Sequence, residues 1–487
     1  MNIITLLRGK TERDSGIYRV YVLAMDTLLA GVSTLSLARW QFAVTTVFHF
    51  LFVPLTIGLG LLVAVLQSAA YRTKDEAWER ATRFFGKLFL VNFAIGVVTG
   101  IVQEFQFGMD WSRYSVFVGN IFGAPLAIEG LLAFFMESTF LGVWIFGRGR
   151  VSDKVHLASI WLASLGTILS AAFIVAANSW MQHPVGYTID PVSHQAVMNN
   201  FWAVMTNSTF LLAYGHVLFS AFLTGSVFML AVSAWHLRRS HDTEAFSKAI
   251  RIAIVVTMIS SLGTIFLGDS QAKQMTTQQP MKMAAAEALY TTSSGASFSL
   301  LTIGDLSGNP VFQVRVPHIL SVLATNTWNV KVEGIHELQA AAAKKYGAGS
   351  YVPVIWILYW SFRVMVGLGF LLLALGAIGL WLMRKHRVET SKRFLRFATW
   401  MALAPFIANS VGWIFTEVGR QPWVVYGLLK TSHAVTLIAP GYVAASFIGF
   451  TAIYSLLAVV EIGLLLRLAK VPAAPLAPAQ AEPELIY

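Results

Sequence analysis

Several apolar runs in this chain are longer than the roughly 20 residues that an α-helix needs to cross about 30 Å of hydrocarbon. Of its 487 residues, 56% are hydrophobic and 12% are charged, which excludes a water-soluble globular protein. Helices satisfy their own backbone hydrogen bonds in lipid, so the sequence predicts an all-α, polytopic membrane protein. Nine membrane-spanning helices are expected, near residues 42–68, 84–106, 121–147, 155–180, 208–236, 249–268, 352–383, 397–418 and 436–468.

Basic residues are concentrated in alternate connections between these spans. The connections after the first, third, fifth and seventh spans are rich in Lys and Arg, whereas the short connections on the other side hold only Arg113, Arg420 and Lys430. By the positive-inside rule the first set is cytoplasmic, so the last span also ends in the cytoplasm. The net charge of +11 mostly reflects this bias, and the sequence has no basic segment suited to recognising a nucleic acid.

Segments of different composition flank and interrupt the membrane body. Residues 39–268 hold the first six spans, and residues 351–470 hold the last three. Between them, residues 269–350 form one polar segment on the outer side, which is too long for a simple helix connection and is therefore expected to be functional. The Pro- and Ala-rich tail 471–487 has the composition of a disordered segment.

Residues 1–38 precede the first span. Basic residues stand before the apolar stretch 20–38, which is the pattern of a signal segment. An additional helix would have to reverse direction at once into the first span, with almost no connection. A cleaved segment, or a start assigned upstream of a true one near Met25 or Val32, fits the sequence better. The three alternatives stay open.

Two histidines, His49 and His216, lie deep inside long apolar runs. An imidazole in hydrocarbon finds no water, so each indicates a functional site, for which we expect iron as the partner. With a rise of about 1.5 Å per residue, both histidines and Glu129 lie about eight or nine residues below the outer ends of their spans. Met365 falls near the same level, and Glu417 lies closer to the outer end. Four potential iron ligands and a further carboxylate therefore share one layer of the membrane.

Each of these residues alone has an ordinary explanation. A membrane histidine can bond a neighbouring carbonyl group, and a methionine often fills an apolar gap. Glu129 and Glu137 could line the ion path of a secondary transporter that binds no haem. The sequence contains no cysteine, which excludes disulfides, thiolate metal sites and covalent haem attachment. Any haem in this chain is therefore held without covalent bonds.

Six stretches of the chain are long and specific, namely 39–59, 85–108, 121–142, 178–186, 360–370 and 412–423. Together they resemble subunit I of the cytochrome bd quinol oxidases, in the same order and in that family's nine-helix layout. The resemblance spans residues 39 to about 468. The chain departs from the family at Ala272, where a glycine is usual, and its segment 269–350 is of the short-loop kind.

The resemblance implies three haems and the residues that hold them. His216 and Met365 match the two axial ligands of a low-spin haem b, an arrangement suited to electron transfer. His49 and Glu129 match the ligands of two high-spin sites, one haem b and one haem d. Which of the two sites holds haem d stays open, as does its replacement by another haem b. Glu417 matches the acid beside this high-spin pair.

The resemblance also implies roles for charged and aromatic residues around the haems. Trp413 matches a candidate electron relay between haems, and Arg363 matches a family arginine near the low-spin haem. Arg420, just past the outer end of the eighth span, is placed to hold haem propionates. Lys282 and Glu287 match quinol-site residues, and either could accept a hydroxyl proton when quinol is oxidised.

Glu137 lies two turns beyond Glu129 toward the cytoplasm, on a similar face, so it can relay protons to the oxygen site. The resemblance thus implies a terminal respiratory oxidase that oxidises quinol at the outer face and reduces dioxygen to water. It would build a membrane potential without pumping protons. The family further implies a second multi-helix subunit, in some members a single-helix small subunit, and a bacterial or archaeal cell membrane. A secondary transporter without haem is the alternative from another class.

Overall fold

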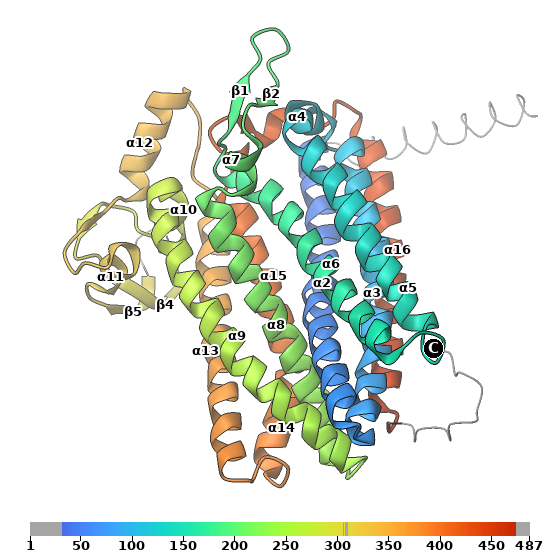
Figure 1. The fold of residues 1–487 in the computed structure, drawn as a ribbon. Coiled ribbons are helices and arrows are strands. Elements are labelled where there is room, and N and C mark those ends of the chain that lie inside the picture. Colours follow the sequence, from blue (N-terminus) through green and yellow to red (C-terminus); the bar gives the residue numbers. More distant parts are fainter. Residues whose placement is uncertain (1–31, 305, 307–309, 474–487) are drawn as a thin grey trace, which may run out of the picture.

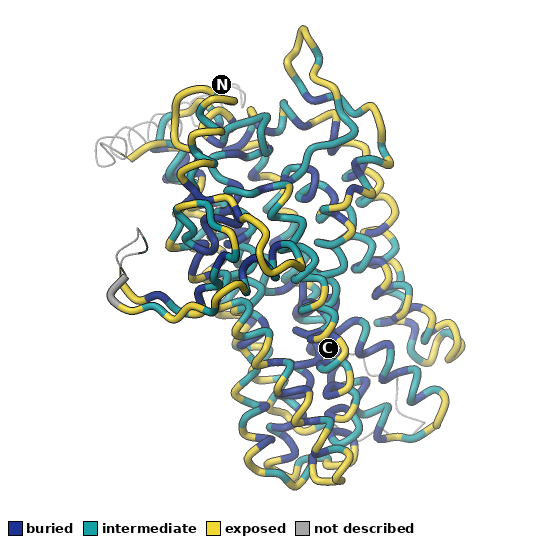
Figure 2. The backbone as a smooth tube through the Cα atoms, turned by 90° about the vertical axis from the view of Figure 1, so that its left-hand side faces the viewer, coloured by how far each residue is buried: buried dark blue, intermediate teal, exposed yellow. Residues whose placement is uncertain are grey.

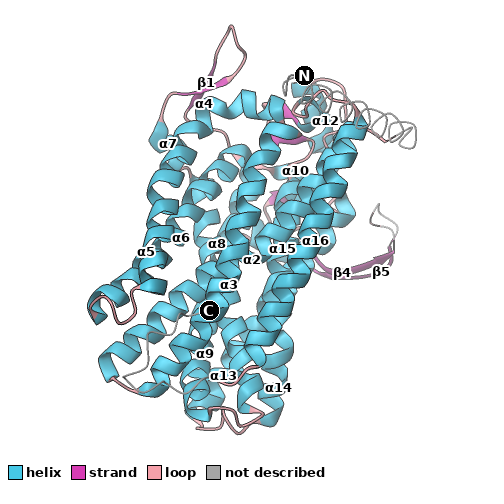
Figure 3. Ribbon diagram, turned by 90° about the vertical axis from the view of Figure 1, so that its right-hand side faces the viewer, coloured by secondary structure: helices cyan, strands magenta, loops and turns pink. Residues whose placement is uncertain are grey.

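The structure confirms the predicted bundle of membrane-spanning helices. It is a computed structural model that describes residues 32–304, 306 and 310–473. Within these residues, nine helical stretches are long and apolar enough to cross a membrane, and they run side by side in Figures 1 and 3. Their bounds are α2 Thr34–Thr73, α3 Glu76–Met109, α4 Ser112–Ile128 continued by η1 Glu129–Phe134 and α5 Phe135–Phe146, α6 Asp153–Gln182, α7 Phe201–Met205 followed by α8 Ser208–Leu237, α9 Thr243–Gln278, α13 Ile355–Arg384, α14 Lys392–Trp400 continued by η2 Met401–Leu403 and α15 Ala404–Gly419, and α16 Pro440–Lys470.

Several helices extend further than their apolar runs indicate, and two of them show why. Helix α2 begins at Thr34 rather than near residue 42, because the Ser33 side chain caps it by accepting a hydrogen bond from the Ser36 amide at 3.1 Å. Helix α9 continues past the expected end at residue 268 to Gln278, since its last turns are polar but no proline interrupts them before Pro280. Residues 1–31 and 474–487, which cover most of the expected N-terminal extension and tail, lie outside the described residues.

The long segment between α9 and α13 folds against one end of the bundle. It contains short elements and two small antiparallel sheets, in which β4 pairs with β5 and β3 pairs with β6. In Figure 1 these elements lie beside the upper half of the helices. Their bounds are α10 Pro280–Ala286, β3 Ser293–Ser294, β4 Phe298–Gly304, β5 Pro310–Val316, α11 Ile319–Thr325, β6 Lys331–Val332 and α12 Ile335–Tyr346.

Two further hairpins lie in the shorter connections on the side of that segment. They pair β1 Tyr187–Ile189 with β2 Ala196–Met198, and β7 Trp423–Val425 with β8 Leu429–Lys430, which η3 Thr431–His433 follows. We call the end of the bundle that carries α10, α12 and these hairpins the loop end. The other end, where α13 finishes and α14 starts, is the basic end, because the Lys- and Arg-rich connections lie there.

The main hydrophobic core occupies the half of the bundle nearer the basic end. There α2, α3, α8 and α9 bury large side chains such as Leu66, Phe85 and Phe246, and Figure 2 shows buried positions along the inside of the helices. Helices α2 and α8 approach closely at a pair of glycines, since a Cβ added to Gly58 would lie 2.8 Å from the Gly225 Cα. The half of the bundle nearer the basic end is tightly packed, whereas the half near the loop end encloses a cavity.

Candidate functional site

A cavity of about 2520 Å³ extends from the loop end into the middle of the bundle. Binding pockets for single small ligands are roughly 300–1,000 Å³, so this cavity has room for several large groups. Every site residue expected from the sequence lines it. These residues come from α2 (His49), η1 (Glu129), α5 (Glu137), α8 (His216), α13 (Arg363 and Met365), α15 (Trp413 and Glu417), the end of α15 (Arg420), α10 (Lys282) and the end of α10 (Glu287).

Both deep histidines are oriented by a hydrogen bond that Nδ1 donates to a neighbouring helix. His49 Nδ1 lies 2.9 Å from the Thr99 hydroxyl, whose own proton is directed at the carbonyls of α3. His216 Nδ1 lies 3.0 Å from the Thr264 carbonyl, which can only accept. Each ring therefore carries its proton on Nδ1 and keeps the lone pair of Nε2. A histidine that ligates a metal is commonly held in this way.

A glycine of an adjacent helix lies against three of the expected iron ligands. A Cβ added at Gly100 would lie 3.2 Å from His49 Cε1, and one added at Gly268 would lie 3.3 Å from His216 Cε1. A Cβ at Gly412 would lie 2.8 Å from the sulfur of Met365. The missing side chains leave the ligand groups room close to the neighbouring backbone, and this set of glycines was not predicted from the sequence.

Glu129 begins the six-residue π-helical segment η1, which interrupts the third membrane span. Its carboxylate accepts a hydrogen bond from the Ser170 hydroxyl at 2.6 Å. Glu137 is 7% exposed and packs against α6, where a Cβ on Gly166 would lie 2.7 Å from the Glu137 Cβ. A π-turn takes about one residue more than an α-turn, so one π-turn followed by one α-turn spans about eight residues. Glu129 and Glu137 are eight residues apart, so they lie on the same face of the span, and both line the cavity.

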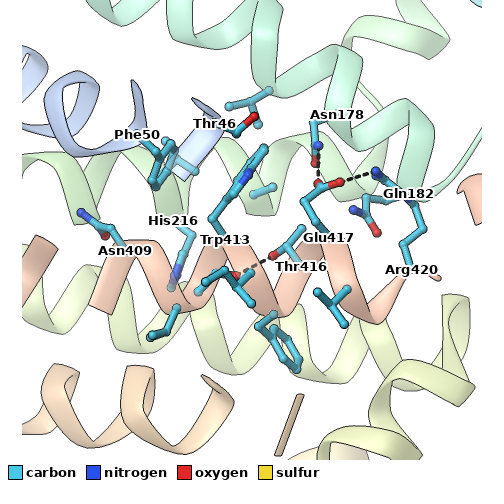
Figure 4. A pocket seen from close by; sticks show the side chains of 18 of the residues that line it. Thr46, Phe50, Asn178, Gln182, His216, Asn409, Trp413, Thr416, Glu417 and Arg420 are labelled. Atoms are coloured by element: carbon cyan, nitrogen blue, oxygen red, sulfur yellow. Dashed lines mark hydrogen bonds and ion pairs between the residues drawn. The ribbon is translucent and has the colours of Figure 1, made fainter. Parts of the chain in front are cut away.

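The eighth span brings an acid, a guanidinium and an indole to the cavity wall, as Figure 4 shows. Glu417 accepts a hydrogen bond from the Asn178 amide at 2.8 Å and forms an ion pair with Arg420. Trp413 stacks on Phe50 of α2, with ring centroids 5.2 Å apart. Arg420 is 2% exposed, and its Nε and Nη1 have no hydrogen-bond partner among the described residues. A buried guanidinium with free donors is suited to bind an anionic group.

Arg363 is bonded differently from Arg420. Its guanidinium donates to the carbonyl oxygens of Ser299 and Ala286, at 2.7 and 2.8 Å, and to the Glu287 carboxylate at 2.9 Å. The side chain thus joins α13 to the start of β4 and to the end of α10. All N–H groups of the Arg363 guanidinium donate to protein acceptors. Within the described part of the chain, only Arg420 of the two arginines expected near the haems therefore has N–H groups free to bind a propionate.

The two charged residues of the segment after α9 are buried at the loop end of the cavity. Lys282 donates to the Gln182 side chain at 2.9 Å, and burial lowers the pKa of its amine to about 7, with Arg420 acting in the same direction. Burial raises the pKa of the Glu287 carboxyl to about 7, although Arg363 opposes this shift. Both groups can therefore exchange protons near neutral pH.

The donor set fits haem better than bare metal ions. Among the described residues no group of three or more His, Asp and Glu side chains is placed to hold an ion. A porphyrin supplies its own four nitrogen ligands, so its iron needs only one or two axial groups from the protein. An imidazole Nε2, a thioether and a carboxylate on separate helices meet that need, and Arg420 offers charge for propionates.

Several residues of the site were not predicted from the sequence. Ser170, Asn178 and Gln182 are the hydrogen-bond partners of Glu129, Glu417 and Lys282, respectively. Asn178 and Gln182 belong to the stretch 178–186 that helped to carry the family resemblance, so a signal for them was present. Ser170 is one of many hydroxyls in an apolar helix, and its position opposite Glu129 is visible only in the fold.

The fold and the cavity define a multi-pass membrane protein that can hold large redox groups in its interior. The sequence profile of the family described as "Cytochrome bd terminal oxidase subunit I" matches residues 37–472. The chain therefore belongs to the cytochrome bd terminal oxidase subunit I family, which confirms the resemblance seen in the sequence.

Individual relatives match over almost their whole length. The chain is 45% identical over 439 residues to a "Cytochrome bd ubiquinol oxidase subunit 1" of Bacillus subtilis (strain 168), covering 90% of this chain and 93% of the relative. It is 34% identical to a "Cytochrome bd-II ubiquinol oxidase subunit 1" of Escherichia coli (strain K12), covering 90% and 96%. The bd oxidase structure from Geobacillus thermodenitrificans superposes with a TM-score of 0.82 at 26% identity, covering 90% of this chain and 98% of that one.

Proposed function

We propose that this chain is the haem-bearing subunit of a terminal oxidase that oxidises quinol and reduces dioxygen to water. The observation that carries the proposal is one continuous cavity, which joins Lys282 and Glu287 at the loop end to His49 and Glu129 in the middle of the bundle. The names of the relatives support quinol as the substrate. A haem-free transporter finds no such support.

Within this proposal, His216 and Met365 hold a low-spin haem b, and His49 and Glu129 serve two high-spin sites, one of which holds haem d or another haem b. The haems supply electron transfer and the iron at which dioxygen is reduced. Gly268, Gly412 and Gly100 give His216, Met365 and His49 room beside the neighbouring helices. Trp413, stacked on Phe50, is an aromatic bridge between α15 and α2 along the electron path.

Lys282 and Glu287 take up the hydroxyl protons of quinol. A general base works best when its pKa is near the ambient pH, and both residues have pKa values of about 7. Arg363 keeps the Glu287 carboxylate in place at 2.9 Å, and Gln182 does the same for Lys282. Protons accepted here leave at the loop end.

Glu137 supplies protons to the oxygen site from the basic end, through Glu129. If the basic end faces the cytoplasm, as the distribution of Lys and Arg indicates, protons are released outside and consumed from inside. That separation alone builds a membrane potential, and no pumping element is needed. The loop segment then lies outside and the end of α16 inside.

The proposal includes partners and location. We expect a second multi-helix subunit, a single-helix small subunit in some assemblies, and a bacterial or archaeal cell membrane. The α16 helix is suited to contact lipid or another subunit, because it exposes large apolar side chains such as Leu456 and Val459.

Purified enzyme, assembled with its partner subunit, tests the proposal. A pyridine haemochrome assay and a reduced-minus-oxidised spectrum should show low-spin and high-spin haems, and quinol should drive oxygen uptake. A protein without haem absorption would contradict the oxidase and support the transporter.

A further inference from the structure

Glu461 on α16 is a buried carboxylate that none of the roles above uses. Its residue is 0% exposed, and neither carboxylate oxygen has a hydrogen-bond partner among the described residues. A charge buried in this way is costly in hydrocarbon and is found mainly along ion or proton paths. The chain itself buries Glu461, so no partner subunit is needed to cover it.

The register between α16 and α2 places Glu461 beside the cavity wall. These helices run in the same direction, because Ser446 donates to the Gln41 side chain at 2.8 Å and the rings of Tyr454 and Phe48 lie 4.9 Å apart further along both. Two turns further along both helices, the same offset in residue number places Glu461 level with Thr56. Thr56 lines the cavity.

The register between α16 and α3 leads to the same level by a separate contact. The Tyr454 hydroxyl donates to the Thr99 carbonyl at 3.1 Å. The helices are antiparallel, so two turns toward the basic end lead from Tyr454 to Glu461 and from Thr99 to Asn92, each on the same face. Asn92 is 0% exposed and donates to the Thr56 hydroxyl at 2.7 Å, while its carbonyl oxygen has no partner among the described residues.

The two registers therefore bring Glu461 level with Asn92 and Thr56 at the interface of α16, α3 and α2, and we call these three residues the polar seam. Its unpaired atoms are the two oxygens of Glu461 and Oδ1 of Asn92. Buried polar groups left in this state are commonly bridged by water, which also conducts protons between them. The seam reaches the cavity on the α2 and α3 side, where His49 lies, whereas Glu137 reaches it from α5.

We propose that Glu461 is a proton relay on a second route from the basic end, through Asn92 and Thr56, to the cavity near His49. This inference rests on the proposed function. The Glu461 carboxylate takes a proton from water at the basic end and becomes a neutral acid. It then releases that proton along the polar seam to the cavity, where the reduction of dioxygen consumes it. Quinol supplies the electrons for that reduction.

The test uses the complete oxidase in lipid vesicles and the variant Glu461→Gln, which keeps the size of the side chain but cannot release a proton. We expect quinol-driven oxygen consumption to fall by about tenfold or more. Haem content and the rate of haem reduction by quinol without oxygen should stay at the wild-type level. Turnover within twofold of wild type, with full haem content, would overturn the inference.

Two further measurements separate a proton relay from a structural role. The infrared difference spectrum between reduced and oxidised enzyme should lose a carboxylic acid band in Glu461→Gln, and an unchanged spectrum would count against the relay. Glu461→Asp, which keeps a titrating group, should recover part of the turnover. If Glu461→Gln does not assemble, Asn92→Leu decides instead, because it removes the polar link to Thr56 and should slow turnover in the same way.

Glu389→Gln is the matched control. Glu389 lies at the basic end and pairs with Arg251 at 2.8 Å, so the variant also removes one carboxylate from that end but not from the seam. Its turnover should equal that of the wild type. Failure of the wild type itself to consume oxygen with quinol would reject the proposed function, whereas an active wild type and an equally active Glu461→Gln would reject only the second route.

Discussion

Charged groups at the loop end of the cavity and carboxylates deeper in the bundle are held in different ways. At the loop end, Glu287 pairs with Arg363 and Glu417 pairs with Arg420. Deeper in, Glu129 has only the Ser170 hydroxyl as a partner, and no ion pair joins Glu129, Glu137 or Glu461 to a cation in the described part of the chain.

This difference indicates that the two regions have different functions. A buried ion pair holds its charges in place, because removing either partner leaves an uncompensated charge. A buried carboxylate without a cation is found mainly along ion or proton paths. The loop end is therefore suited to bind and orient ionised groups, and the deep region is suited to move protons.

The largest effect is expected at the proposed ligands of the low-spin haem. His216→Ala and Met365→Leu each remove one of these two proposed ligands, so either should abolish the low-spin haem signal in the reduced-minus-oxidised spectrum. High-spin signals can persist. An unchanged low-spin spectrum in either variant would reject the ligand assignment.

Glu137→Gln tests the deep region directly. The change keeps the volume and hydrogen-bonding capacity of the side chain and removes its proton, so turnover should fall by about 10²-fold while haem content is kept. Steady-state oxygen consumption by the fully haem-loaded enzyme measures this. Near-normal turnover would remove Glu137 from the proton path. A change in spectra without a change in rate would make it a residue of the haem environment.

Glu287→Gln tests the loop end. The amide keeps an oxygen that can accept from Arg363 but cannot take up a proton, so quinol oxidation should fall. Oxygen uptake driven by an artificial donor that reduces the haems directly should be largely kept. Lys282→Leu is expected to separate the same two activities. Equal loss of both would show that the segment is only structural.

The smallest expected effect is a pH dependence of quinol oxidation. Below about pH 7 both Lys282 and Glu287 are protonated, so the rate should fall with decreasing pH, by at most about tenfold per pH unit for one titrating group. A rate that stays constant between pH 6 and 8, both about one unit from these pKa values, would contradict the assignment of both residues as proton acceptors.

Stability should depend on pH in opposite senses for the two groups. The pKa of Glu287 is raised from 4.5 to about 7, so the folded state binds more protons in that interval and stability falls as pH rises through it. The pKa of Lys282 is lowered from 10.5 to about 7, so stability rises with pH between those values. Unfolding midpoints of Glu287→Gln and Lys282→Leu across pH should each lose one of these slopes.

The sequence was sufficient for the number of membrane spans and for eleven site residues, all of which line the cavity. Hydropathy finds apolar runs, and depth along those runs places His49, His216, Glu129 and Met365 in one layer. Hydropathy could not show that α9 continues as a polar helix to Gln278, because the pattern reports contact with lipid rather than helical hydrogen bonding.

The partners of the site residues could not be predicted in the same way. Arg363 was expected at a haem, but its bonds to Ser299 and Glu287 depend on how the segment after α9 folds back on α13. Glu461 was not predicted as a site residue from the sequence. Only the register of α16 against α2 and α3 places it level with Thr56 and Asn92.

The π-helical segment at Glu129 has a consequence for how this span tolerates insertions and deletions. Such segments behave as a helix that has gained one residue, so deleting a residue between Glu129 and Phe134 should restore a regular helix. The two glutamates would then be seven residues apart, and seven residues at about 100° each make about two turns, so both would stay on one face of the helix. The π-helical segment therefore accommodates one extra residue without moving Glu137 away from the cavity. A relative with one residue fewer in this stretch would keep the same pair of acids, and a one-residue alignment gap here does not mark a change of proton route.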